Sequence, residues 1–264
     1  MQGADRGKAT VSDITTIATK IEEAGLDSLW MAHIRSLDAI SALTVAGAKT
    51  STIELGTAVT PIQPRHPMAL AQQAMTAAQV CGGRFTLGIG LSHKVVIEGM
   101  LGLSYDQPAR YMQDYLAAFL PLLKGKVTNY AGEHFKIKNL QIDVSGTDRL
   151  PVVLAALGPA MLKIAGTHTT GTSTWMVGPK TLETHVVKIL QDAARSASQP
   201  SARVIAGFPV VVTNNVETAK RKLGEELAIY GELPSYRAML DKEGIENPVD
   251  IALIGDENIL RQRK

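Results

Sequence analysis

Two of the six histidines come at the ends of predicted strands, where a side chain could take part in acid–base chemistry. His33 lies in the run DSLWMAHI (27–34), and His93 follows the run FTLGIG (85–90). The carboxyl ends of parallel strands carry the reacting groups of α/β barrels, and an imidazole titrates near neutral pH. Each histidine is therefore a candidate acid or base, although a hydrogen bond within a loop explains it as well. No histidine pair has the spacing of a metal site such as H-E-x-x-H, so no metal is expected.

Small residues gather at the ends of three predicted strands. On the strand 84–90, Thr86, Gly88 and Gly90 share one face, and a face without large side chains predicts room for a ligand. The runs AALGP (155–159) and WMVGP (175–179) end in a similar way, and backbone N–H groups there could meet a phosphate or a ring edge. A flat, extended ligand would use the three edges together.

The run GIGLSH (88–93) also resembles two other motifs. It is not a complete dinucleotide-binding fingerprint, because His93 replaces the third glycine and no acidic residue ends a strand about 20 residues further on. It is not a complete nucleophile elbow either, because Lys94 replaces the last glycine. A serine hydrolase acting through Ser92 stays open as an alternative.

Apolar runs and helical patterns alternate along the chain, which predicts an α/β fold with parallel strands joined by crossover helices. The predicted strands are 27–34, 53–59, 84–90, 151–157, 172–177 and 203–213. A (β/α)₈ TIM barrel has eight strands, so the first and last strands are not evident and the barrel is expected to be incomplete. The segment at about 94–148 reads as an excursion with a helix over 107–123 and a hairpin over 127–144. A further helix is expected over 249–264.

The composition is that of a globular protein; the length suits one large α/β domain as well as two small ones, and a single domain over residues 1–264 is expected. Of the 264 residues 45% are apolar and 20% are charged, and the net charge is +2. This balance gives no basic stripe for nucleic acid and no case for a membrane surface. A single cysteine, Cys81, and an N-terminus without an apolar core indicate a cytoplasmic protein.

Several segments, in order and spacing, resemble the luciferase-like monooxygenase superfamily, and more narrowly its branch of coenzyme F-420-dependent oxidoreductases. The segments are EEAGLDSLW (22–30), IELGTAVTPIQPRHPMALAQQAMT (53–76), GGRFTLGIGLSH (82–93), AALGPAMLKIAG (155–166), TWMVGP (174–179) and LPSYRAMLDKEG (233–244). One departure is Thr170-Gly171, where relatives commonly have Asp-Gly before the sixth strand.

The resemblance implies a luciferase-like (β/α)₈ barrel with the deazaflavin ring at its C-terminal mouth. It implies a non-prolyl cis peptide at Ala58-Val59 behind the ring, and a proton donor or acceptor for which His33 is the first candidate and His93 the second. The implied cofactor-binding residues are Ala58, Val59, Gly88, Gly90, Leu91, Ser92, Ala155, Ala156, Gly158, Pro159, Ser173 and Thr174.

The implied activity is hydride transfer between coenzyme F-420 (8-hydroxy-5-deazaflavin) and a small organic substrate, in a homodimer. An FMN-dependent monooxygenase of the same superfamily and a degenerate, non-catalytic barrel remain alternatives.

Overall fold

The computed structural model describes residues 9–146 and 150–262. These residues form two compact units. The N-terminal unit comprises the described residues up to Ala155 together with His168–Thr170, and the C-terminal unit comprises Ala156–Thr167 and the residues from Gly171 onward. That the whole chain acts as a single domain stays a prediction.

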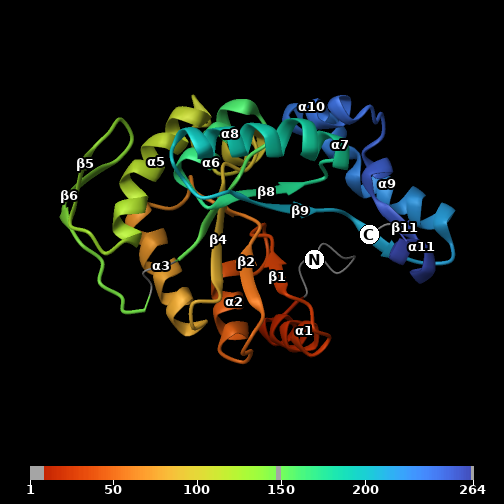
Figure 1. Cartoon of the computed structure of the whole chain (residues 1–264), viewed down its shortest axis with the longest axis horizontal. Helices are drawn as coiled ribbons and strands as arrows, with labels where there is room; N and C mark the ends of the chain where they lie inside the picture. The colour runs from red at the N-terminus through yellow and green to blue at the C-terminus, as the bar shows by residue number, and fades with distance from the viewer. Residues whose placement is uncertain (1–8, 147–149, 263–264) are drawn as a thin grey trace. The chain divides into compact units, whose positions relative to one another are not determined.

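Parallel strands form the centre of the N-terminal unit (Figure 1). They are β1 (Ser28–Met31), β2 (Glu54–Thr57), β3 (Thr60–Pro61), β4 (Phe85–Gly90) and β7 (Val152–Ala155). Their order is β1-β2-β4-β7, and the short β3 also pairs with β4. Every residue of β4 is buried, because helices and neighbouring strands cover parallel strands on both faces.

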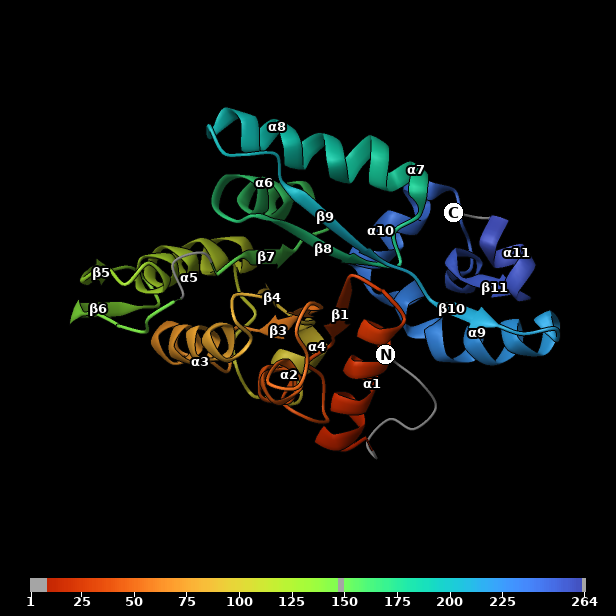
Figure 2. The same ribbon diagram turned by 60° about the horizontal axis from the view of Figure 1, so that its bottom comes forward.

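Three helices accompany these strands, α1 before the first of them and α2 and α3 as crossover connections, and Figures 1 and 2 show them next to one another. They are α1 (Val11–Glu23), α2 (Ala39–Gly47) and α3 (Pro67–Val80). Pro67 starts α3 at a position where its missing N–H breaks no hydrogen bond. The sequence predicts Ser12 or Asp13 as the cap of α1, but Thr10 is the cap. Thr10 Oγ1 accepts from the Asp13 amide, and the Asp13 carboxylate accepts from the Thr10 amide, which makes a capping box.

The predicted excursion contains the predicted helix and hairpin. It comprises α4 (Lys94–Ile97), α5 (Pro108–Leu123), β5 (Thr128–Ala131) and β6 (Lys136–Leu140). The strands β5 and β6 are antiparallel, and both contact α5.

The C-terminal unit has two pairs of parallel strands. Strand β8 (Gly171–Trp175) pairs with β9 (Arg203–Gly207), and β10 (Val210–Val212) pairs with β11 (Leu253–Gly255). Its helices are α6 (Pro159–His168), α7 (Pro179–Thr181), a π-helical turn η1 (Leu182–Val187), α8 (Lys188–Ser196), α9 (Val216–Glu232), α10 (Pro234–Glu243), a 3₁₀ turn η2 (Pro248–Ile251) and α11 (Glu257–Gln262). Figure 2 shows α6 and α8 side by side. Met176, Leu227, Leu240 and Ile251 form a buried apolar cluster.

Two predictions about this unit are wrong in detail. The strand expected over 203–213 is interrupted at Phe208–Pro209, because proline has no N–H for a strand ladder. The helix expected over 249–264 is instead a 3₁₀ turn, the strand β11 and the short helix α11. Pairing with the distant β10 determines the conformation of Leu253–Gly255, and local periodicity does not reveal that pairing.

Candidate functional site

The backbone turns between β2 and β3 at a cis peptide bond that joins Ala58 and Val59, at the predicted position. The Ala58 amide donates to the Met31 carbonyl at 2.8 Å, which ties this turn to the end of β1. Beyond the turn, Thr60 and Pro61 pair with Ile89 and Gly90 of β4. The turn therefore lies beside the glycine-rich end of β4.

The space beside Gly88 and Gly90 is filled by the protein itself. A Cβ atom on Gly88 would lie 1.9 Å from the Thr57 carbonyl oxygen, and one on Gly90 would lie 2.7 Å from Val59 Cγ2. The Thr57 hydroxyl also donates to the Gly88 carbonyl (2.7 Å) and accepts from its amide (2.9 Å). The expectation that these glycines leave open room is wrong, because they allow the β2–β3 backbone to approach. That they help to bind a cofactor stays a prediction.

Just beyond this turn, two buried polar atoms have no hydrogen-bond partner among the described residues: Thr60 Oγ1 in β3 and Gln63 Oε1 after it. The side chain of Thr60 is fully buried, and the Gln63 Nε2 group donates to the Leu91 carbonyl at 2.6 Å. Unpartnered buried polar atoms are rare and call for an explanation, and a ligand with polar edges is one. No motif singles out either residue in the sequence, although both lie in the segment 53–76 that carries the resemblance.

His33, the first catalytic candidate, lies in a cluster of polar side chains. Its Nε2 atom is 2.9 Å from Arg65 Nη2 and 3.6 Å from Asp38 Oδ2, and its Nδ1 atom is 3.3 Å from the Ala39 amide nitrogen. Asp38 caps α2 by accepting from the Ser41 amide at 2.8 Å. Arg65 also donates to Asp38 at 3.2 Å.

Burial and charge together lower the pKa of His33, which favours the neutral ring. Burial is the largest cause that lowers the pKa of His33, and the Arg65 guanidinium lowers it further. The Asp38 carboxylate raises it by a smaller amount. Burial raises the pKa of Asp38, but hydrogen bonds from Ser41 and the nearby His33 and Arg65 hold that pKa below its ordinary value. A proton added to His33 would face the Arg65 cation.

His93, the second candidate, follows the end of β4 and precedes α4. The Leu91 and Ser92 carbonyls accept from Gln63 Nε2 and from the Tyr105 hydroxyl, which hold the backbone before His93. Ser92 itself has a left-handed backbone with φ of 58°. His93 is half-buried, and burial lowers its pKa.

The remaining predicted residues lie on β7, α6 and β8. Ala155 ends β7 in the N-terminal unit, and Ala156, Gly158 and Pro159 follow in the C-terminal unit, where Pro159 begins α6. On β8, Ser173 and Thr174 are buried, and Thr174 Oγ1 has no hydrogen-bond partner among the described residues. That these residues bind one cofactor stays a prediction.

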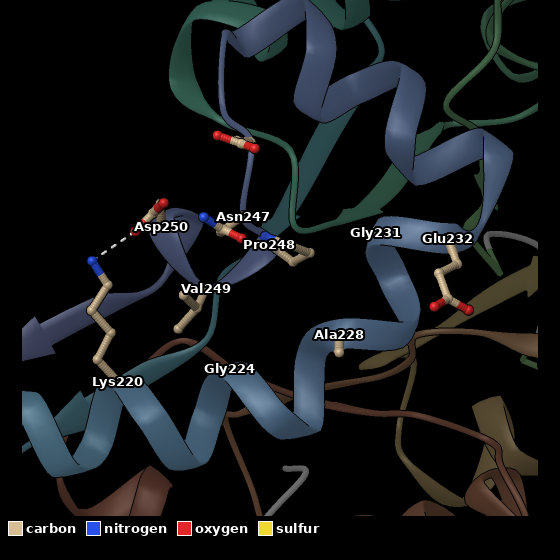
Figure 3. Close-up of a pocket in the computed structure, with 10 residues that line it drawn as sticks. Lys220, Gly224, Ala228, Gly231, Glu232, Asn247, Pro248, Val249 and Asp250 are labelled. Atoms are coloured by element: carbon tan, nitrogen blue, oxygen red, sulfur yellow. Dashed lines mark ion pairs between the residues drawn. The ribbon is translucent and has the colours of Figure 1, made fainter.

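A separate pocket of about 460 Å³ lies between α9 and η2 in the C-terminal unit (Figure 3). Across it Lys220 Nζ pairs with Asp250 Oδ1 at 2.8 Å. Small residues on α9 allow the close packing here, since a Cβ on Gly231 would lie 3.2 Å from Pro248 Cγ. No predicted site residue lines this pocket.

Within residues 9–146 and 150–262, no group of three or more His, Cys, Asp or Glu side chains is arranged to hold a metal ion. In the same part of the chain, no helix is both long enough and apolar enough to cross a bilayer.

Comparison with known proteins identifies the family. The model of the luciferase-like monooxygenase family matches residues 1–261. The 5,10-methylenetetrahydromethanopterin reductase of Methanolobus tindarius is 27% identical over 238 residues, which are 89% of this chain and 72% of the relative. The chain therefore belongs to the luciferase-like monooxygenase family and is an oxidoreductase of that family.

Solved structures confirm the α/β fold. The coenzyme F-420-dependent tetrahydromethanopterin reductase from Methanopyrus kandleri superimposes with a TM-score of 0.77 at 24% identity, over 90% of this chain and 73% of that one. The FMN-bound oxygenating constituent of 3,6-diketocamphane monooxygenase from Pseudomonas putida superimposes with a TM-score of 0.76 at 15% identity. The match covers 98% of this chain and 84% of that one. The predicted luciferase-like TIM-barrel fold class is thus confirmed.

Proposed function

We propose that the protein transfers a hydride between coenzyme F-420 and a small organic substrate. The observation that carries the proposal is the similarity to a methylenetetrahydromethanopterin reductase over 89% of this chain. The likeness to a coenzyme F-420-dependent reductase from Methanopyrus kandleri supports the choice of cofactor. When bound, a deazaflavin supplies a carbon centre that carries a hydride and reacts poorly with oxygen.

The unpartnered polar atoms of Thr60 in β3 and Gln63 after it fit such a cofactor. A deazaflavin ring has polar edges, and Thr60 Oγ1 and Gln63 Oε1 are buried atoms without a partner among the described residues. We expect these two side chains and the backbone of Ala58, Val59, Leu91 and Ser92 to hold the ring. Ala155, Ala156, Gly158 and Pro159 are expected at the phosphate and tail, together with Ser173 and Thr174, and the unpartnered Thr174 hydroxyl supports that expectation.

The contacts of His33 disfavour it as the residue that moves a proton. Both nitrogens of His33 face hydrogen-bond donors, the Arg65 guanidinium and the Ala39 amide. Neither nitrogen of this ring is open toward a substrate, whereas His93 lies directly after the glycine-rich end of β4. His93 is therefore the proposed proton-transfer residue.

An FMN-dependent monooxygenase is the second candidate, because an FMN-bound monooxygenase has the same fold with a TM-score of 0.76. Titration of the purified protein with oxidised coenzyme F-420 and, separately, with FMN distinguishes the two. We expect saturable binding of F-420 followed through its fluorescence, and weaker or no binding of FMN. Tight FMN binding without a response to F-420 would move the assignment to the flavin enzymes, and no binding of either would indicate a non-catalytic barrel.

A further inference from the structure

Arg65 connects three parts of the N-terminal unit around the His33 ring. Its Nη1 donates to the Pro61 carbonyl at 3.2 Å, just beyond the cis peptide. Its Nη2 contacts His33 Nε2 at 2.9 Å and donates to Asp38 Oδ2 at 3.2 Å. The guanidinium thereby links the end of β1, the cap of α2 and the turn before α3.

The Arg65 contact restricts where the His33 proton can be. A guanidinium has only donors, so a hydrogen bond at 2.9 Å requires Nε2 of His33 to be an unprotonated acceptor. A neutral imidazole has one acceptor nitrogen, so the proton is then on Nδ1. The competing contact, from the Ala39 amide to Nδ1, is longer at 3.3 Å and carries no formal charge. With the proton on Nδ1, the Ala39 amide, which begins α2 and has no acceptor within the helix, loses this hydrogen bond, a cost that the shorter, charge-assisted contact from Arg65 outweighs.

Asp38 holds Arg65 rather than the His33 ring. Its Oδ2 atom is 3.2 Å from Arg65 Nη2 but 3.6 Å from His33 Nε2. Its Oδ1 atom accepts from Gln73 Nε2 of α3 at 3.2 Å as well as from the Ser41 amide. The carboxylate is therefore fixed from two helices, and it neutralises the guanidinium beside the imidazole.

We propose that Arg65 is a positioning residue for His33, and that its guanidinium holds the imidazole in the neutral tautomer with the proton on Nδ1 and a lone pair on Nε2. His33 then has no proton to give from Nε2, and it acts as a hydrogen-bonded link between β1 and the turn that follows β3. The tautomer is a property of the protein alone. Its consequence for proton transfer rests on the proposed function.

Nuclear magnetic resonance of the full chain with ¹⁵N-labelled histidine tests the tautomer directly. Two-bond correlations between ring protons and ring nitrogens show which nitrogen carries the proton, and the signal lost in His33→Gln assigns the residue. We expect an unprotonated Nε2 and a protonated Nδ1 at neutral pH without any ligand. A protonated Nε2 in the unmodified protein would overturn the proposal before any Arg65 variant is made.

Variants separate the role of Arg65 from that of Asp38. In Arg65→Met the proton is expected to move to Nε2, because Asp38 Oδ2 becomes the nearest partner and Nδ1 can accept from the Ala39 amide. Arg65→Lys, which keeps a charged donor, is expected to restore the original tautomer, and Asp38→Asn is expected to leave it unchanged. Arg110→Met is the matched control, since Arg110 is exposed and pairs with Glu133. An unchanged tautomer in a folded Arg65→Met protein would contradict the proposal.

The effect on turnover distinguishes a positioned ring from a proton donor. His33→Gln keeps an oxygen that can accept from Arg65 but has no acid function. We expect kcat with F-420 to fall by no more than about tenfold, whereas removal of a general acid costs roughly 10²–10⁴-fold. A loss in the larger range would contradict the proposal. If the protein does not turn over F-420 at all, the proposed function fails while the spectra still decide the tautomer.

Discussion

At the scale of single residues, β4 contains glycines because another part of the backbone passes against it. Gly88 lies opposite the Thr57 carbonyl, and Gly90 lies against the Val59 side chain. A methyl group at either position would occupy space that β2 and the following turn already fill. The glycines therefore determine how close the β2–β3 turn can come to the end of β4, which is where the proposed ring-binding residues lie.

Replacement of Gly88 by alanine should destabilise the fold strongly. The new Cβ would lie 1.9 Å from a backbone oxygen, which cannot move as a flexible side chain can. We expect a loss of at least about 3 kcal/mol in the free energy of unfolding, the upper end of the range for overpacked cores. Urea unfolding measures it, with Gly224→Ala on α9 as the control. That Cβ would meet only Val249 at an ordinary 3.8 Å, so no loss is expected there.

Replacement of Thr60 by valine should weaken cofactor binding without weakening the fold. Valine has the same shape, and the hydroxyl that it removes is buried without a partner among the described residues. The free energy of unfolding should stay the same or rise by about 1 kcal/mol. The dissociation constant for F-420 should rise roughly fivefold to tenfold, the effect of one lost hydrogen bond. A variant that loses stability but binds F-420 normally would show that the hydroxyl serves the fold instead.

At the scale of elements, Asp114 fixes the β5–β6 hairpin to α5. Its carboxylate accepts from the Tyr130 hydroxyl and from the His134 amide at 2.6 Å, and its Oδ2 atom lies 3.2 Å from His134 Nδ1. Asp114 is buried, and these hydrogen bonds together hold its pKa below the ordinary value although burial raises it. A two-stranded hairpin is marginally stable alone, so this anchor matters.

Replacement of Asp114 by alanine should loosen the hairpin. It leaves the His134 amide and the Tyr130 hydroxyl without their acceptor, which costs about 1–3 kcal/mol. Hydrogen exchange should become faster over residues 128–140. Glu133→Ala is the matched control, because this exposed carboxylate of the same hairpin pairs only at the surface with Arg110. Equal effects of the two variants would contradict the anchoring role of Asp114.

Glu22 makes a comparable link between α1 and the start of β2. Its Oε1 atom accepts from the amides of Thr52 (2.6 Å), Ser51 (2.8 Å) and Ile53 (3.0 Å). These hydrogen bonds lower the pKa of Glu22 to about 2, and the one from the Thr52 amide has the largest effect. Because the folded-state pKa lies below the ordinary value of 4.5, the unfolded chain takes up the proton first as the pH falls. The carboxylate therefore stabilises the folded state fully when the pH is above the ordinary pKa of 4.5, and this stabilisation is lost as the pH falls toward about 2.

Replacement of Glu22 by glutamine should therefore have a pH-dependent effect. The unmodified protein should be more stable than Glu22→Gln at neutral pH, and the difference should shrink as the pH is lowered from about 5 to about 2. Urea unfolding at several pH values measures this, with Glu23→Gln as the neighbouring control. A difference that is constant over this range would contradict the role of the carboxylate charge.

How far the sequence predicts these elements depends on whether their causes are local. The helix α5 and the β5–β6 hairpin were predictable, because amphipathic periodicity and strand alternation are properties of short segments. The strand β11 was not, because it exists through pairing with β10. The same limit applies to the site. The cis peptide was expected from the family resemblance, whereas the His33–Arg65 contact joins residues 32 positions apart and neither residue alone predicts it.

At the scale of the whole molecule, the residues proposed for one cofactor are distributed over both compact units. The N-terminal unit carries the β2–β3 turn, the end of β4 and Ala155, and the C-terminal unit carries the start of α6 and the end of β8. A cofactor that binds only the folded state stabilises every part of the protein that it contacts. The proposed function therefore predicts a response to F-420 in each unit.

Saturating F-420 should slow hydrogen exchange in peptides from both units and raise the unfolding temperature. At 100 times the dissociation constant, binding adds about 2.7 kcal/mol, or roughly 5 °C for a chain of this size. We expect protection over residues 58–63 and 88–93 in the N-terminal unit, and over 156–159 and 173–174 in the C-terminal unit. FMN at the same concentration is the control ligand. Protection confined to the N-terminal unit would show that Ala156, Gly158, Ser173 and Thr174 do not bind the cofactor, because a bound phosphate and tail would restrict exchange at their amides.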